Sequence, residues 1–194
     1  MLKMRLAVTG MLVVLALWGA SAAHAQTFYN LTVDHCTGGC GTSPFGTVEL
    51  QQAGAGSVLV TVTLVPVDHF LHSGLHAFTF DVGGTATIAV STTGFTADPL
   101  GSYHQDGFGN FPYAIECSPC GGNTLSFTVS ETGLTVSSFV FNGSAFFTAD
   151  IHSDTTGNGG AVGAAPEPAS MLLFGTGLLA LGAVLRRSLT GISA

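Results

Sequence analysis

The sequence predicts an all-β fold, an antiparallel β-sandwich or jelly-roll-like domain that occupies residues 26–156. Polar and apolar side chains alternate along residues 47–51 and 58–65, which is the period-two pattern of half-buried strands. Threonine, valine and phenylalanine dominate these runs, and such side chains fit a pleated sheet. Glycine-rich turns separate the runs, among them Asn142-Gly143, a favoured tight hairpin turn. Short strands at regular intervals indicate a sandwich.

Each alternating run is expected to form one strand, with its phenylalanines in the core between the sheets. Residues 92–116 alternate less and are rich in polar, glycine and aromatic residues. We interpret this segment as a long loop and as the first place to look for a ligand site. The predicted strands cover residues 28–33, 47–51, 58–65, 76–82, 85–91, 125–130, 138–141 and 145–151. The expected core phenylalanines are Phe78, Phe80, Phe127, Phe139, Phe141 and Phe146.

Charge is divided sharply along the chain of 194 residues. Its 4 basic residues lie near the two ends, and residues 26–165 hold 10 of the 11 carboxylates, a formal charge of 0 − 10 = −10 with neutral histidines. Nucleic-acid affinity comes largely from Lys and Arg that neutralise phosphates. The composition therefore excludes DNA, RNA and nucleotides as partners of the domain. Without basic partners, the carboxylates are expected to face solvent and to keep the protein soluble.

Residues 1–25 have the three regions of a secretory signal peptide, with a signal helix in the middle. Lys3 and Arg5 give a positive start, and residues 6–18 form an apolar run. Ala23 and Ala25 frame an A-x-A cleavage site, so we expect signal peptidase to cut before Gln26.

A second targeting pattern follows the domain. Residues 157–165 are rich in glycine and alanine and predict a flexible linker. Residues 166–187 then combine Pro166-Glu167-Pro168, an apolar run and the pair Arg186-Arg187. The apolar run is at the short end of the about 17–25 residues that span a bilayer as a transmembrane helix. The two arginines should stay cytoplasmic under the positive-inside rule, with residues 188–194 as a short cytoplasmic tail.

This C-terminal segment resembles the PEP-CTERM sorting domain, the exosortase signal of Gram-negative bacteria that make exopolysaccharide. The resemblance rests on Pro166-Glu167-Pro168, the apolar span and the basic pair in that order. It implies that the Pro-Glu-Pro segment is recognised by a membrane-embedded exosortase, which cleaves near it. It also implies a precursor that is anchored in the inner membrane, followed by attachment at the cell surface or release outside the cell. The two prolines disfavour helix and keep the segment accessible to a peptidase.

The cysteines form two close pairs, Cys36 with Cys40 and Cys117 with Cys120. In an exported protein such pairs favour two disulfides. The adjacent glycines favour local pairing over cross-pairing between the two pairs. A zinc site built from all four cysteines is the alternative. A redox role for residues 117–120 would need a thioredoxin-like context, which an all-β domain does not supply.

Three histidines, His69, His72 and His76, are spaced three and four residues apart beside Asp68. On a helix they would share one face and could ligate a transition metal. However, Gly74 interrupts the stretch and the strand pattern resumes soon after it. We therefore interpret them as loop residues and assign neither a metal nor a cofactor.

Hydrolase signatures such as G-x-S-x-G and H-E-x-x-H do not occur in the sequence. Carboxylate pairs of the glycosidase kind can be drawn from Asp98, Asp106 and Glu116, but any acidic loop offers such pairs. The prediction is an exported, non-catalytic surface or matrix protein that associates with exopolysaccharide. A carbohydrate- or cation-binding module that uses residues 92–116 is the alternative, and a polymer hydrolase is less favoured.

Overall fold

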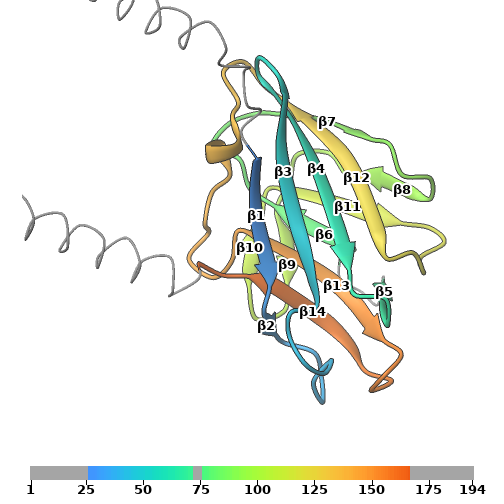
Figure 1. The fold of residues 1–194 in the computed structure, drawn as a ribbon. Coiled ribbons are helices and arrows are strands. Elements are labelled where there is room, and N and C mark those ends of the chain that lie inside the picture. The colour runs from blue at the N-terminus through green and yellow to red at the C-terminus, as the bar shows by residue number, and fades with distance from the viewer. Residues whose placement is uncertain (1–25, 72–75, 167–194) are drawn as a thin grey trace, which may run out of the picture.

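The computed structural model describes residues 26–71 and 76–166 and places two antiparallel sheets face to face (Figure 1). The first sheet has 5 strands in the order β1-β3-β4-β12-β7. Its central strands have long registers, which pair Gly46 with Leu64 and Thr124 with Thr63. The strands are β1 (Gln26–Leu31), β3 (Gly46–Gly54), β4 (Ser57–Leu64), β12 (Thr124–Ser130) and β7 (Thr87–Val90).

The second sheet has 7 strands, in the order β2-β14-β13-β6-β11-β8, with β5 paired to β13 beside that path. A separate hairpin joins β9 to β10, and η1 is a short 3-10 turn. The elements are β2 (Val33–Asp34), β5 (Asp68–Phe70), β6 (Phe78–Phe80), β8 (Phe95–Ala97), β9 (Tyr103–Gln105), β10 (Gly109–Phe111), β11 (Tyr113–Cys117), η1 (Val136–Ser138), β13 (Phe147–Ser153) and β14 (Gly159–Ala164).

These sheets confirm the all-β class and the antiparallel pairing that the sequence predicted. The predicted signal helix and transmembrane helix lie outside the described residues. Among residues 26–71 and 76–166, no helix is long and apolar enough to cross a membrane.

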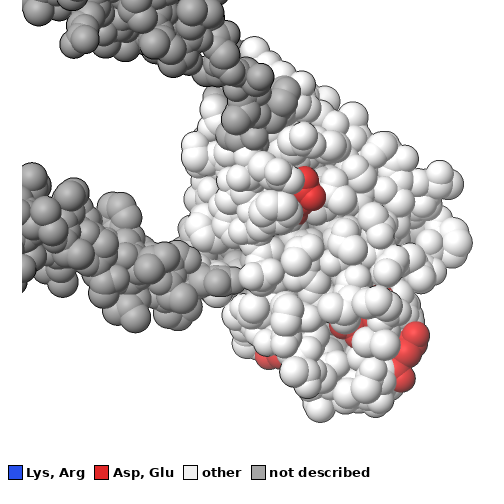
Figure 2. Space-filling model, viewed as in Figure 1, with Lys and Arg blue, Asp and Glu red and all other residues white. Residues whose placement is uncertain are grey.

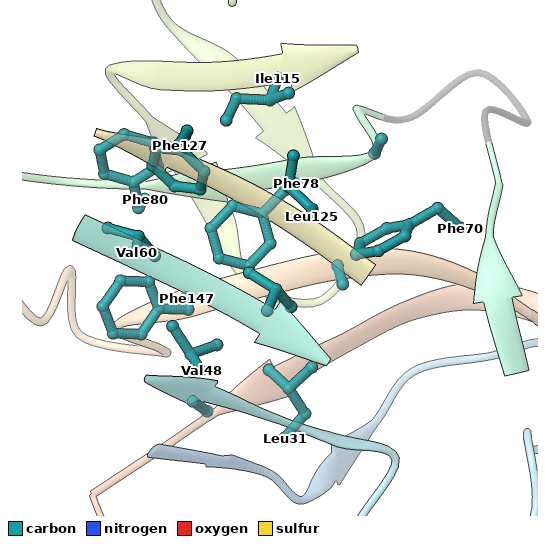
Figure 3. Close-up of a cluster of buried hydrophobic side chains, with 14 of the residues drawn as sticks. Leu31, Val48, Val60, Phe70, Phe78, Phe80, Ile115, Leu125, Phe127 and Phe147 are labelled. Carbon is teal, nitrogen blue, oxygen red and sulfur yellow. The ribbon is translucent and has the colours of Figure 1, made fainter. Parts of the chain in front are cut away.

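The main core lies between the two sheets, where alternate residues of facing strands meet (Figure 3). The apolar residues of β4, from Val58 to Leu64, are at most 1% exposed at every second position, as their alternation predicted. Across the sheets, the ring of Phe127 lies 5.8 Å from that of Phe78 and 5.3 Å from that of Phe80. Aromatic contacts at these distances stabilise the core beyond the area that they bury.

A smaller core covers the outer face of the seven-stranded sheet. Phe108 and Phe111, from the hairpin β9–β10, pack there with Ala145 and Ala161. The predicted long loop over residues 92–116 is therefore wrong in part, because this segment contains β8, β9, β10 and β11. Strands of three to five residues are too short to show a clear alternation.

The segment predicted as a flexible linker, residues 157–165, is also different in the structure. Residues 159–164 form β14, which pairs with β13 on one side and β2 on the other. Its small residues are needed for close packing: the Phe108 ring leaves no room for a side chain at Gly163, and the backbone of Cys36 leaves none at Gly160. The glycines and alanines that resemble a flexible linker in the sequence are small because neighbouring segments pack closely against this strand.

The phenylalanines near residue 140 depart from the prediction in a similar way. Phe139 is 5% exposed and belongs to the main core, but Phe141 is 37% exposed and Phe146 is half-buried. The predicted strand over residues 138–141 is wrong, because η1 precedes it and only an isolated bridge joins Phe139 to Val82.

Carboxylates were expected to face solvent, yet Asp68 is only 3% exposed and Asp150 is fully buried. Asp150 lies opposite Ala161 of β14, and Ala161 belongs to the smaller core that covers the outer face of the seven-stranded sheet with Phe108 and Phe111. Burial raises the pKa of the Asp68 carboxyl above its usual value, while a hydrogen bond from Ser153 and the nearby His69 act in the opposite direction.

The turn between β3 and β4 requires glycine at position 56, and this requirement can be tested. Gly56 has φ +71°, and a Cβ at this position would lie 2.5 Å from the carbonyl oxygen of Glu131. We expect Gly56→Ala to lower the free energy of unfolding by more than about 1–2 kcal/mol, the cost of the left-handed backbone alone. Gly54→Ala is the matched control, because Gly54 has open space around it. Equal losses in urea unfolding of the two variants would contradict this explanation.

Candidate functional site

Three side chains, those of His76, Asp98 and Glu116, meet on the outer face of the seven-stranded sheet. Neighbouring strands bring them together: His76 precedes β6, Asp98 follows β8, and Glu116 lies in β11 between these two strands (Figure 1). Because side chains alternate along β11, Ile115 points into the main core and Glu116 points to the opposite face.

The imidazole of His76 faces both carboxylates. Its Nδ1 lies 3.4 Å from Oδ2 of Asp98 and forms a short hydrogen bond with Oε1 of Glu116. The three side chains are 25%, 26% and 21% exposed in the order His76, Asp98 and Glu116. The cluster is thus shielded from bulk solvent but still open to a small ligand.

Two residues of β9 support this cluster. The ring of Tyr103 packs edge-on against the His76 imidazole, with 4.7 Å between the ring centroids. The side-chain amide of Gln105, which is fully buried, donates a hydrogen bond of 2.6 Å to the carbonyl of His76. Burial, and then the charges of Asp98 and Glu116, raise the pKa of the Tyr103 hydroxyl above its usual value. Tyr103 therefore lies within the electrostatic field of the two carboxylates.

A hollow of about 410 Å³ adjoins the cluster. It opens at the edge of the sandwich, between β7 of one sheet and β8 of the other. Ile88, Pro99 and Leu100 supply apolar lining, and Asp98 supplies a carboxylate. Asp98 belongs to both features, so a ligand in the hollow would lie next to the cluster.

A second group joins His69, His152 and Asp154 near the paired strands β5 and β13. His69 and His152 face each other across the strands, with ring centroids 5.0 Å apart. Nδ1 of His69 lies 3.6 Å from Oδ1 of Asp154, whose side chain is 65% exposed. This group is more open to solvent than the cluster of His76.

The structure separates the histidines that the sequence grouped together. His69 and His76 belong to different clusters, and His72 lies outside the described residues. Asp98 and Glu116, from the segment singled out for a ligand site, do meet. Asp106 does not join them and lies instead 3.5 Å from the exposed His104. Sequence reasoning missed His152 and Asp154, because no spacing motif links them to His69.

The cysteines form two local disulfides, Cys36–Cys40 and Cys117–Cys120, with Cα–Cα distances of 5.6 and 5.0 Å. This is the pairing that the sequence favoured, and it leaves no free thiol for a zinc site built from four cysteines. The carboxylate of Asp34 accepts hydrogen bonds from the backbone N–H groups of Cys36 and Cys40 and so holds the first loop in place.

The predicted targeting residues lie largely beyond the described part of the chain. Ala23, Ala25, Glu167, Pro168, Arg186 and Arg187 are outside it. Gln26 is the first residue of β1 and donates a side-chain hydrogen bond to Glu49. Pro166 is exposed and stands two residues after the last residue of β14. The Pro-Glu-Pro segment therefore begins almost at the surface of the folded domain.

Figure 2 shows one face of the molecule, with carboxylates at a few separate places and no lysine or arginine on it, and the sequence holds neither between residues 26 and 166. The fold thus defines a disulfide-bonded, acidic β-sandwich that ends at a Pro-Glu-Pro segment. A comparison with family models matches residues 164–187 to the PEP-CTERM protein-sorting motif. The chain thus carries a PEP-CTERM sorting motif at its C-terminal end, which supports a secreted, surface-targeted protein that is a substrate of an exosortase. Searches of curated proteins and of solved structures find no match to the chain.

Proposed function

We propose that this protein is a non-catalytic component of the cell surface or extracellular matrix, where its acidic β domain associates with exopolysaccharide. In this proposal signal peptidase cuts before Gln26, and the apolar segment before Arg186 anchors a precursor in the inner membrane. Exosortase then cleaves near Pro166 and transfers the domain to the surface or the medium.

The observation that carries the proposal is the joining of a sorting motif to a compact domain without lysine or arginine. Ten carboxylates and two disulfides suit a soluble domain in an oxidising, extracellular setting. The absence of basic side chains from residues 26–165 speaks against phosphate or nucleic-acid ligands. Neutral or cation-bridged polysaccharide is compatible with such a surface.

Fractionation of cells with and without an exosortase tests the proposed route. With the exosortase, the protein should lose the mass of the tail after Pro166 and move from the membrane to the surface or the medium. Without it, the larger form should stay in the membrane. Replacing both Glu167 and Pro168 by Ala should mimic loss of the exosortase, whereas Glu131→Ala, in a loop of the domain, should be processed normally. Equal processing of all forms would refute the route.

A second candidate function is a carbohydrate- or cation-binding module within the same matrix. One observation favours it: the hollow beside β7 and β8 shares Asp98 with a half-buried cluster of potential ligand atoms. A sugar ring could pack on the apolar lining while its hydroxyl groups reach the carboxylate. A cation would instead bind at the cluster itself.

A further inference from the structure

One donor atom from each of His76, Asp98 and Glu116 lies within 4.8 Å of the other two. The three residues come from separate segments of the chain, so their convergence is a product of the fold and not of a local turn. Two ligands with metal bonds of about 2.0–2.2 Å lie at most about 4.4 Å apart. Nδ1 of His76 and Oδ2 of Asp98, 3.4 Å apart, already meet this limit. The Glu116 carboxylate, which now hydrogen-bonds to His76, needs only to turn away from the imidazole to admit an ion between the three donors.

The charge around the cluster calls for a cation. Asp98 and Glu116 together contribute two negative charges in a region that is only about a quarter exposed. Nowhere in residues 26–166 is there a lysine or arginine to balance them. Like charges at such short range repel each other strongly when they are partly removed from water. A divalent ion would cancel both charges and leave the His76 imidazole neutral, as a metal ligand must be.

The surroundings hold the donors in position before any ion binds. The Gln105 amide fixes the backbone at His76, and Tyr103 packs against the imidazole. Glu116 is held by the pairing of β11 with β6 and β8 on either side. Such supporting contacts orient metal ligands and increase affinity.

We infer that His76, Asp98 and Glu116 bind a divalent transition-metal ion of the Zn²⁺ type. One imidazole nitrogen with two carboxylate oxygens is a ligand set that suits Zn²⁺, whereas Ca²⁺ and Mg²⁺ bind through oxygen. The inference rests on the cation-binding candidate and specifies its ion. The adjoining hollow, which Asp98 also lines, offers space beside the ion for water or a polymer hydroxyl group.

The other two groups of potential ligands serve as internal comparisons. In the group of Asp34, Cys36 and Cys40, both sulfurs are consumed by the disulfide. The group of His69, His152 and Asp154 is more exposed and would use two imidazoles. It differs from the proposed site in the number of histidine ligands, which X-ray absorption spectroscopy of the bound metal can distinguish.

Calorimetric titration of the purified full chain in detergent with Zn²⁺ alone tests the site. Binding to the unaltered chain is expected, and Glu116→Gln should weaken it by at least about 100-fold, because even supporting residues of metal sites contribute about 10–100-fold. Asp98→Asn should have a similar effect. The matched control His152→Gln should retain the affinity of the unaltered chain, and an equal concentration of Ca²⁺ should not compete.

The inference is overturned if the unaltered chain binds no Zn²⁺, if His152→Gln rather than Glu116→Gln abolishes binding, or if Ca²⁺ displaces Zn²⁺. X-ray absorption of the Zn²⁺-loaded unaltered chain is a second test that does not depend on whether a variant folds. One imidazole with oxygen ligands around the Zn²⁺ would support the site, and two imidazoles would refute it. Failure here would leave sorting by exosortase intact, and failure of sorting would leave Zn²⁺ binding intact, so the two proposals are tested separately.

Discussion

A chain of residues 26–156 will fail to fold, whereas a chain of residues 26–166 will fold fully. The difference is β14, which is paired on both sides: its removal leaves β2 without a partner and exposes one edge of β13, which then pairs only with β5 and β6. Val162 is fully buried, which alone is worth about 1.5–3 kcal/mol. Each lost ladder hydrogen bond adds about 0.5–1.5 kcal/mol. The total is comparable with the whole stability of a domain, about 5–15 kcal/mol.

Near-ultraviolet circular dichroism and thermal unfolding of the two chains measure this effect. A third chain that ends at residue 164 retains all of β14 and controls for the residues beyond it. We expect this third chain to melt within a few degrees of the chain that ends at residue 166. A cooperative transition of residues 26–156 at the same temperature would show that β14 contributes nothing to the fold.

Phe80→Ala will lower the free energy of unfolding strongly, because it removes a ring from the centre of the main core. Phe80 is fully buried and its ring stacks on Tyr113 at 5.3 Å, with Phe127 at the same distance across the core. Removing a buried phenylalanine ring costs about 3–5 kcal/mol, through lost burial and the cavity that remains. This is a large fraction of the stability of a domain.

The matched control is Phe28→Ala, since Phe28 lies on β1 and is 60% exposed. It should change the free energy of unfolding by no more than about 0.5 kcal/mol. Denaturant unfolding of both variants gives the change in the free energy of unfolding for each, with the same dependence on denaturant concentration used for both. Similar losses at the two positions would mean that the core does not lie between the sheets as described.

The local pattern of the chain was sufficient for the fold class and for most of the first sheet. Period-two alternation in β3 and β4 depends only on which face each side chain takes, and that is a property of neighbouring residues. The local disulfides could be favoured for the same reason, because partners three or four residues apart need no long-range contact. The sorting motif is likewise a continuous segment.

The candidate site could be located only in part. Residues 92–116 were singled out for a ligand, and they contribute Asp98 and Glu116. His76, however, was grouped with His69 and His72 through its spacing along the chain. Its real partner Glu116 is 40 residues away and becomes a neighbour only because β6 pairs with β11. Strand pairing of this kind leaves no signal in a single sequence.

By itself, then, the sequence determined an acidic, all-β protein with a sorting tail, because the sorting motif, the charge and the alternation are all read from contiguous residues. Tertiary structure alone decided that β14 is a buried strand, that Asp150 is buried, and that one histidine meets two carboxylates. The physical reason is common to all three. They depend on what covers the outer face of the second sheet and on which strands pair there, and both are properties of the packed chain.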